Sequence, residues 1–238
     1  MALSITIAAL LMQMSKKVGF SGHLVTISKY NCWFTYDMAV TAAVNAGFTP
    51  DYAPDEDTVF EKDNGMLMGS VFFRMLGFSQ VTEMEYEGSG ETGCVLTDLN
   101  RSETPASLIG QADAVFDLGT SEHIFHFPNL LAHMGRILKP RGLVLHHAPT
   151  NNQVNHGFYQ FSPTAYFDYY RANGYGSMMC VLNTFDAPRD LDQGFYGISG
   201  DAEWNELPKD HRAAMTLFLA RKPNYEAEQV IPMQRLYQ

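Results

Sequence analysis

Charged residues are scarce in this chain, and basic residues are scarcer than acidic ones. They make up 18% of the 238 residues, and 16 Lys and Arg against 26 Asp and Glu give a formal net charge of −10. A protein that binds a phosphate backbone needs a basic face. We therefore expect no nucleic-acid partner, whereas a small-molecule substrate is compatible with this balance.

Cysteine is also rare. Cys32, Cys94 and Cys180 are far apart, odd in number, and match neither a metal-ligand spacing nor a disulfide framework. We expect buried thiols that behave as small apolar side chains, in a reducing, cytoplasmic setting.

No long hydrophobic run is present. The most apolar stretch, MALSITIAALLMQMSKK at residues 1–17, is shorter than the roughly 20 residues of a membrane span. It has no basic residue before it and no clear small-residue cleavage site. We expect an N-terminal amphipathic helix packed on the domain, with no membrane span. A contact with a membrane surface or with a second copy in a homo-oligomer is the alternative.

What the chain does contain is enough apolar residues for a buried core. A hydrophobic content of 46% over this length is typical of one globular domain, here residues 1–238, with a long irregular segment at 184–211 before the last strand. Apolar runs alternate with segments of helical pattern, which indicates β-α-β units and a parallel sheet. The seven predicted strands are 23–27, 80–86, 94–96, 114–116, 143–145, 177–183 and 215–220.

The segment 114–152 is the most informative. It reads AVFDLGTSEHIFHFPNLLAHMGRILKPRGLVLHHAPTNN, in which two short apolar strands flank a predicted helix at 128–138 and a Lys-Pro-Arg-Gly turn at 139–142. Each strand is followed at once by polar, ionisable residues. Ligands of parallel sheets bind beyond the carboxyl ends of the strands, so these residues are expected at a binding site.

This segment resembles the class I S-adenosylmethionine (SAM)-dependent methyltransferases. Their fourth strand ends in an acidic residue, often followed by Glu-His-Val/Ile, and a helix then ends in Leu-Lys-Pro-Gly-Gly. The equivalents here are Asp117, Glu122-His123-Ile124 and Leu138-Lys139-Pro140-Arg141-Gly142, with Arg141 in place of one glycine. The resemblance spans roughly residues 18–223. It implies a Rossmann-like α/β fold with a central, mostly parallel, seven-stranded sheet, helices on both faces and an antiparallel last strand.

The resemblance also implies SAM as cofactor. Glu83 or Glu85 would end the second strand and bind the ribose hydroxyls, since a carboxylate accepts two hydrogen bonds. Asp98 and Leu99 would hold the adenine, although a surface turn is the alternative there. The methionine part would pass beside two residues of the fourth strand tip, Asp117 and Gly119.

The first cofactor loop departs from the family. It reads Ser-Lys-Tyr-Asn-Cys-Trp at residues 28–33 and contains no glycine, whereas glycine usually lets the backbone approach SAM closely. Ser28 and Asn31 remain as hydrogen-bonding groups for the methionine part. A plain strand-to-helix connection is the other interpretation.

Histidine is the side chain best suited to take a proton from an acceptor near neutral pH. Of eight histidines, we predict His123 as general base or acceptor contact, with Glu122 orienting it, and His156 as the next catalytic candidate. Structural roles for these histidines remain open. Substrate contacts are predicted for three further residues: His126, His147 and Tyr159. A metal site of Glu122, His123 and His126 is conceivable, but the spacing is not diagnostic, and we predict no metal ligands.

These observations predict a SAM-dependent methyltransferase that acts on O or N of a small molecule. The alternative is a degenerate methyltransferase-like domain that binds or scaffolds without transferring a methyl group. The glycine-free loop favours this alternative. A third interpretation is a SAM-binding enzyme with non-methyl chemistry, such as a lyase.

Overall fold

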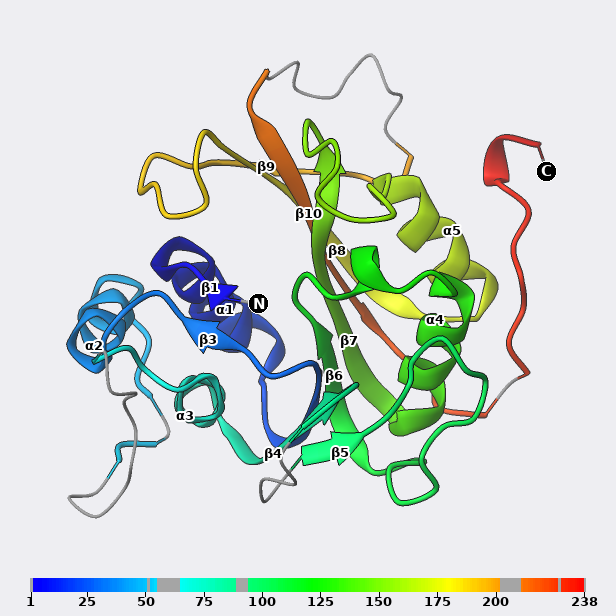
Figure 1. The fold of residues 1–238 in the computed structure, drawn as a ribbon, viewed down its shortest axis with the longest axis horizontal. Coiled ribbons are helices and arrows are strands. Elements are labelled where there is room, and N and C mark those ends of the chain that lie inside the picture. Colours follow the sequence, from blue (N-terminus) through cyan, green and yellow to red (C-terminus); the bar gives the residue numbers. More distant parts are fainter. Residues whose placement is uncertain are drawn as a thin grey trace. The chain divides into compact units, whose positions relative to one another are not determined.

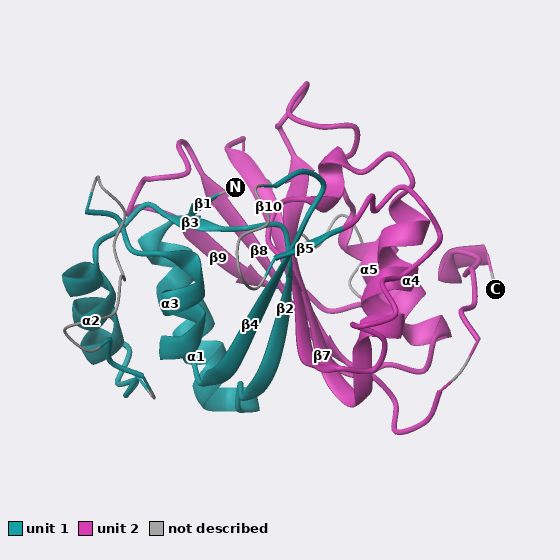
Figure 2. Cartoon of the chain, turned by 60° about the horizontal axis from the view of Figure 1, so that its bottom comes forward, with its two compact units in different colours: residues 1–96 teal, residues 97–238 magenta. Residues whose placement is uncertain are grey.

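The structure, a computed structural model, describes residues 2–50, 52–54, 65–88, 94–201, 211–226 and 228–237. The chain divides into two compact units, Met1–Leu96 and Thr97–Gln238 (Figure 2).

In its described residues, unit 1 combines three helices with three parallel strands of a sheet. The sheet has the order β5-β4-β2, and both strand pairs are parallel. A further short pair, β1 and β3, is also parallel. The elements are β1 (Ala2–Leu3), α1 (Ile5–Val18), β2 (Gly22–Ile27), β3 (Asn31–Cys32), α2 (Tyr36–Asn45), α3 (Gly69–Met75), β4 (Phe78–Glu85) and β5 (Cys94–Leu96).

The helix expected at residues 1–17 is α1. It begins at the N-cap Ser4, whose side chain accepts a hydrogen bond from the Ile7 backbone N–H at 3.3 Å, and ends at Gly19 with φ of 72°. Its buried face includes Leu11 and Met12, both 0% exposed. The apolar residues of this stretch therefore lie in the core of unit 1.

Unit 2 contains a mixed sheet with the order β6-β7-β10-β8-β9. Strands β6 and β7 are parallel, and β10 is antiparallel to both β7 and β8, as expected for the last strand. Figure 1 shows β7 and β10 as long neighbouring strands. The elements are β6 (Ala112–Asp117), the 3₁₀ turn η1 (Ser121–His123), α4 (Phe127–Ile137), β7 (Leu138–Asn151), α5 (Pro163–Ala172), β8 (Gly176–Phe185), β9 (Gly194–Gly197), β10 (Ala213–Arg221) and the 3₁₀ turn η3 (Arg235–Tyr237).

Together these strand orders confirm the predicted fold class, an α/β protein with mostly parallel strands. The strand β9, which pairs antiparallel with β8, is an additional strand that the sequence did not predict. It lies within the segment 184–211, of which residues 202–210 are outside the described part of the chain.

The strand β7 differs from the sequence prediction, which placed a turn at residues 139–142. Those residues belong to a continuous strand, and the pairing with β6 shifts from Ala112–Leu138 to Ala114–Leu143. Three extra residues of β7 are accommodated as a bulge. Arg141 has φ of 66° there, so it adopts the left-handed conformation at the position where the resembling family has glycine.

Helix α5 supplies aromatic side chains to the core of unit 2. The Ser162 side chain caps its first turn, and Pro163 is its first residue. Tyr166 and Tyr170, both 1% exposed, stack on Phe218 of β10 with ring centroids 5.5 Å apart in each case. This packing fixes the helix over the strands that carry the candidate site.

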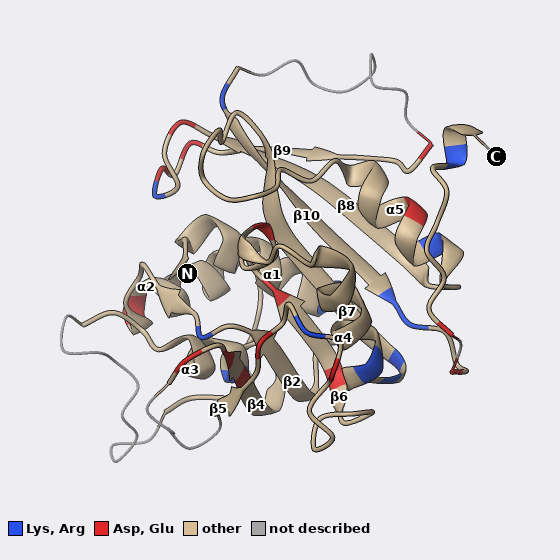
Figure 3. Ribbon diagram, turned by 45° about the vertical axis from the view of Figure 1, so that its right-hand side comes forward, with Lys and Arg blue, Asp and Glu red and all other residues tan. Residues whose placement is uncertain are grey.

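Charged groups of unit 2 lie mainly at the ends of elements (Figure 3). Lys139 of β7 pairs with Asp113 of β6 at 2.9 Å, and Lys222 donates to the backbone carbonyls of Gly135 and Leu138 at 2.8 Å each. Among the described residues, no helix has both the length and the apolar character to cross a bilayer.

Candidate functional site

The turn after β6 is organised by Asp117, which is 0% exposed. Its Oδ1 accepts hydrogen bonds from the backbone N–H groups of Thr120 at 3.0 Å and Ser121 at 3.1 Å. Gly119, with φ of 97°, allows the chain to reverse between them. Asp117 was predicted to lie beside the cofactor. That position stays a prediction. In the structure, its carboxylate is buried and shapes the turn.

The other carboxylate oxygen of Asp117, Oδ2, contacts a second buried side chain, that of His146. His146, at the matching position of the parallel strand β7, places its Nδ1 2.9 Å from Asp117 Oδ2. Its Nε2 lies 2.6 Å from the hydroxyl of Tyr170. The three side chains form a buried Asp–His–Tyr chain that ties β6 and β7 to α5.

The pKa of the Asp117 carboxyl is lowered within this hydrogen-bonded Asp–His–Tyr chain. Burial alone would raise the pKa, but the hydrogen bond and charge of His146, with the backbone donors of the turn, outweigh it. Burial raises the pKa of Tyr170 well above its usual range, so its hydroxyl keeps its proton. The chain therefore holds a carboxylate and a phenol at neutral pH.

Beyond the turn, three of the predicted catalytic residues come together. Glu122 Oε1 lies 3.9 Å from His123 Nε2 and 3.6 Å from His156 Nε2. The two imidazole rings are 5.4 Å apart. The Glu122 side chain is 0% exposed, whereas those of His123 and His156 are 43% and 46% exposed. A buried carboxylate thus lies beneath two solvent-facing imidazoles.

Burial shifts the pKa values of Glu122 and His123 in opposite directions. Burial, followed by the charge of Asp117, raises the pKa of Glu122 to about 8. Burial and the neighbouring His156 lower the pKa of His123, which favours its neutral form. A raised carboxyl pKa in a group facing two imidazoles is typical of functional sites.

The loop after β7 places His156 over Glu122 by a close backbone approach. Asn155 adopts a left-handed conformation with φ of 66°, which asparagine tolerates. A Cβ on Gly157 would lie 2.8 Å from the Glu122 carbonyl oxygen, so a side chain at that position would clash. The Phe158 N–H then donates to the same carbonyl at 2.7 Å. Glycine at 157 is therefore a requirement of the geometry.

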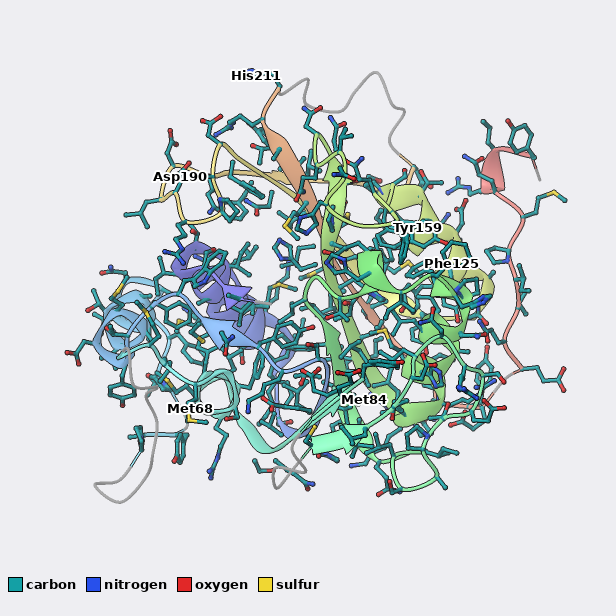
Figure 4. All side chains as sticks on the ribbon, in the orientation of Figure 1. Met68, Met84, Phe125, Tyr159, Asp190 and His211 are labelled. Atoms are coloured by element: carbon teal, nitrogen blue, oxygen red, sulfur yellow. The ribbon has the colours of Figure 1, made fainter. Side chains whose placement is uncertain are left out.

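The predicted substrate contacts His126 and Tyr159 lie on the exposed side of the same region. Tyr159 donates its hydroxyl to the Phe125 carbonyl at 2.7 Å, and Figure 4 shows the two residues side by side. Phe125 itself is 60% exposed and packs edge-on against Phe158, which is 64% exposed. His126 also packs edge-on against Phe125, with ring centroids 5.7 Å apart. These aromatic groups form an exposed surface beside the Glu–His–His cluster.

His147, the third predicted substrate contact, is only 7% exposed. Among the described residues, its Nε2 has no hydrogen-bond partner. Burial lowers its pKa to about 4, so the ring is neutral at physiological pH. Its role as a substrate contact stays a prediction, and its buried position in β7 makes it a sensitive reporter of folding.

In unit 1, the glycine-free loop is held by the end of β4. Ser28 has φ of 89°, the left-handed conformation that glycine would adopt. Glu85 Oε1 accepts from the Ser28 hydroxyl at 3.0 Å and from the Lys29 N–H at 2.5 Å. Glu83 is half-buried two residues earlier, and Asn31 lies in the short strand β3. The assignment of these four residues to cofactor binding stays a prediction. In the structure, the Glu85 carboxylate is already hydrogen-bonded to the loop.

The predicted adenine contacts Asp98 and Leu99 open unit 2. Asp98 accepts from the Asn100 backbone N–H at 3.0 Å and from Arg101 Nε at 3.3 Å, as in a surface turn. The Asn100 backbone bond is the main cause of its lowered pKa. Leu99 is 7% exposed. The Asp98 carboxylate is therefore hydrogen-bonded within its own turn, and the Leu99 side chain is buried.

Two residues of the site escaped sequence reasoning. His146 and Tyr170 are buried and belong to the hydrogen-bonded Asp–His–Tyr chain that begins at Asp117. No functional role was predicted for either residue from the sequence. The signal that could have found His146 was its place at the end of the strand next to Asp117. The partner from α5 depends on the helix packing, which the sequence pattern does not specify.

Comparisons with known proteins identify no close relative. No family profile matches the chain, and no curated protein matches it. Several solved structures with a similar fold are methyltransferases. A SAM-dependent methyltransferase of Thermotoga maritima is 16% identical, with 92% of this chain and 91% of that chain covered and a TM-score of 0.44. A SAM-dependent methyltransferase of Archaeoglobus fulgidus is 9% identical, with 92% and 95% covered and a TM-score of 0.48.

A third structure was determined with ligands. It is the 1,6-didemethyltoxoflavin-N1-methyltransferase of Burkholderia thailandensis with bound 1,6-didemethyltoxoflavin and S-adenosylhomocysteine, 12% identical, with 92% and 78% covered and a TM-score of 0.43. At these identities and TM-scores the likenesses carry no argument about the reaction. The fold assignment rests on the strand order and direction in each unit.

Proposed function

We propose that this chain is a SAM-dependent methyltransferase that acts on O or N of a small molecule. The observation that carries the proposal is the carboxyl end of β6 in unit 2. There, a buried Asp117 organises the turn, and the buried carboxylate of Glu122 lies under two exposed imidazoles. The strand order of unit 2, with an antiparallel β10 between β7 and β8, supports the resemblance on which the cofactor assignment rests.

The chemistry assigned to these residues is proton removal. SAM supplies an electrophilic methyl group when it is bound. His123 Nε2 takes the proton of the acceptor O–H or N–H, and His156 offers a second imidazole 5.4 Å away, measured between ring centroids. The imidazolium that forms is stabilised by Glu122 when the Glu122 carboxyl is ionised, which a pKa of about 8 places at mildly alkaline pH. The Oε1 atom lies 3.6–3.9 Å from both Nε2 atoms. Both rings are solvent-facing and can pass the proton on.

The backbone of unit 1 fits the proposed cofactor. Ser28 adopts the left-handed conformation that glycine provides in the resembling loops. The turn is maintained by Glu85, which accepts from the Ser28 hydroxyl and from the next backbone N–H. The loop backbone therefore has a glycine-like conformation at Ser28, whose hydroxymethyl side chain stands where glycine has a hydrogen. We assign Ser28, Asn31, Glu83 and Glu85 to SAM binding as part of this proposal.

The alternative is a methyltransferase-like domain that binds without transferring a methyl group. One observation favours it: two of the carboxylates predicted to hold the cofactor already bond to their own chain. Glu85 accepts from the Lys29 N–H, and Asp98 accepts from the Asn100 N–H. A ligand would have to share these oxygens or displace their partners.

Calorimetric titration with SAM and with S-adenosylhomocysteine separates the two. The methyltransferase proposal expects micromolar binding of both ligands. It also expects Asp117→Ala to weaken that binding, because the turn after β6 would lose its organising carboxylate. His211→Ala is the control, since this exposed residue stands just before β10 (Figure 4). Absence of binding up to millimolar SAM would favour the non-catalytic domain.

A second experiment tests the roles on the acceptor side. With an acceptor found by screening, His123→Ala should lower kcat more than it weakens SAM binding. Equal losses of both would contradict the assigned role. Mass spectrometry of the products then separates methyl transfer from other SAM chemistry, because only the former yields a methylated acceptor.

A further inference from the structure

The Glu122, His123 and His156 cluster has the composition of a metal site. One carboxylate oxygen and two imidazole nitrogens, offered by these three residues, all lie within 4.8 Å of one another. Two histidines and one carboxylate are a ligand set for zinc and for neighbouring transition ions, whereas Mg²⁺ and Ca²⁺ prefer oxygen ligands throughout.

An independent observation points to a missing partner. Glu122 is 0% exposed, and within the described part of the chain neither of its carboxylate oxygens receives a hydrogen bond. A buried carboxylate is costly unless it is paired or binds a metal. The distances from its Oε1 to the two imidazole nitrogens, 3.6 and 3.9 Å, are too long for hydrogen bonds.

Those distances are close to the separations that a metal ion would impose. With metal–ligand bonds of about 2.0–2.2 Å, tetrahedral ligand atoms lie roughly 3.3–3.6 Å apart. Both histidine side chains are more than two-fifths exposed, so their rings can rotate toward the carboxylate and toward each other, which brings the three ligand atoms from within 4.8 Å into this range. The carboxylate at the base is fixed by burial and by the Phe158 N–H on its own backbone carbonyl.

We propose that Glu122, His123 and His156 bind one divalent transition-metal ion, with zinc as the reference ion. Three protein ligands, two of them at the solvent-facing rim, leave a coordination position open to water or to an acceptor oxygen or nitrogen. The site is contained in unit 2. Metal binding and proton acceptance are alternative roles for the same group, because the one lone pair of His123 Nε2 cannot bind a metal ion and take a proton at once. His126, which the sequence offered as a third ligand, is replaced by His156 from the loop after β7.

The test uses untagged protein stripped by a chelator and titrated calorimetrically with Zn²⁺. Wild type should bind one ion per chain with micromolar or tighter affinity. His123→Ala, His156→Ala and Glu122→Gln should each weaken binding by at least about tenfold, because each removes a ligand. His126→Ala is the matched control: it removes a neighbouring exposed imidazole and should leave the affinity within about twofold of wild type. Circular dichroism establishes that each variant is folded.

Cobalt substitution gives a readout of coordination itself. Co²⁺ bound by wild type should show the intense visible absorption of a four- or five-coordinate ion, and His156→Ala should lose it. Three results would overturn the proposal: no saturable Zn²⁺ binding by wild type, unchanged affinity in folded His156→Ala, or an equal loss in His126→Ala. None of these measurements involves SAM, so failure of the metal site and failure of the methyltransferase proposal are distinguishable.

Discussion

The buried histidine of β7 makes the pH dependence of stability a sharp test of the structure. His147 is 7% exposed, and its neighbour across the sheet is Leu217 of β10. Burial, only partly offset by Asn183 and by the charge of Asp117, lowers the pKa of His147 from 6.5 to about 4. The perturbation is His147→Gln, which removes the titrating group and retains a polar side chain.

The sign follows from proton uptake on unfolding. Between pH 6.5 and pH 4 the unfolded chain binds a proton at His147 that the folded chain does not bind. The contribution of His147 to stability is therefore fully present above pH 6.5 and is lost as the pH falls toward 4. One pKa unit is worth about 1.4 kcal/mol, so wild type loses about 2 kcal/mol by pH 5 and about 3 kcal/mol by pH 4 from this group.

Urea unfolding of wild type and His147→Gln at pH 7, 6, 5 and 4, with chelator present, measures this loss. The free-energy difference between the two proteins isolates His147, because other titrating groups, Glu122 included, are common to both. We expect the wild type to lose about 3 kcal/mol more than the variant between pH 7 and pH 4. Parallel pH profiles would refute the buried, neutral histidine and with it the packing of β7 against β10.

The remaining predictions concern the backbone and the polar chain of unit 2, and each is measured by chemical unfolding. Asp117→Asn should lower stability by about 2–4 kcal/mol, since it leaves a buried imidazole without its carboxylate. Asp113→Asn, which breaks only a partly exposed ion pair, should cost less than about 1 kcal/mol, and equal costs would contradict the burial of the first pair. Arg141→Gly should stabilise by up to about 1 kcal/mol and Arg141→Val should destabilise by about 1–2 kcal/mol, because the residue has φ of 66°. The opposite order would exclude the left-handed conformation. Gly157→Ala should cost about 1–3 kcal/mol, whereas Gly197→Ala, with no described atom within 4 Å of the added carbon, should be nearly neutral.

Local patterns were sufficient to predict most of the elements. Strands such as β2 and β6 are short apolar runs that end in polar residues, and α5 has both a Ser162 cap and a proline at its first position. The strand β9, with the sequence GFYG, was missed because four residues with two glycines carry no apolar alternation. The true length of β7 was missed because its bulge contains Lys-Pro-Arg-Gly, a sequence typical of turns.

Some residues of the candidate site could likewise be predicted from local sequence, whereas others depend on tertiary contacts. Glu122 and His123 could be found because they follow a strand within a recognisable motif. His156 was proposed from the polar loop after β7, but its position over Glu122 depends on the close approach at Gly157. The Asp117–His146–Tyr170 chain needed the register of two strands and the packing of a helix. Tertiary contacts of this kind leave no periodic signal in one sequence.

Two residues with positive φ show why residue identity is a weaker indicator than backbone conformation. Arg141 stands where the resembling family has glycine and Ser28 opens the glycine-free first loop, and their φ values are 66° and 89°. The left-handed conformation costs about 1–2 kcal/mol at each position. Hydrogen bonds offset part of that cost: Glu85 bonds to the loop at Ser28, and the Arg141 carbonyl accepts from Arg221 at 2.9 Å. A strained conformation retained against its local preference indicates that the path itself matters. At Ser28, the positive φ means that the absence of glycine from the loop does not exclude a glycine-like backbone conformation there.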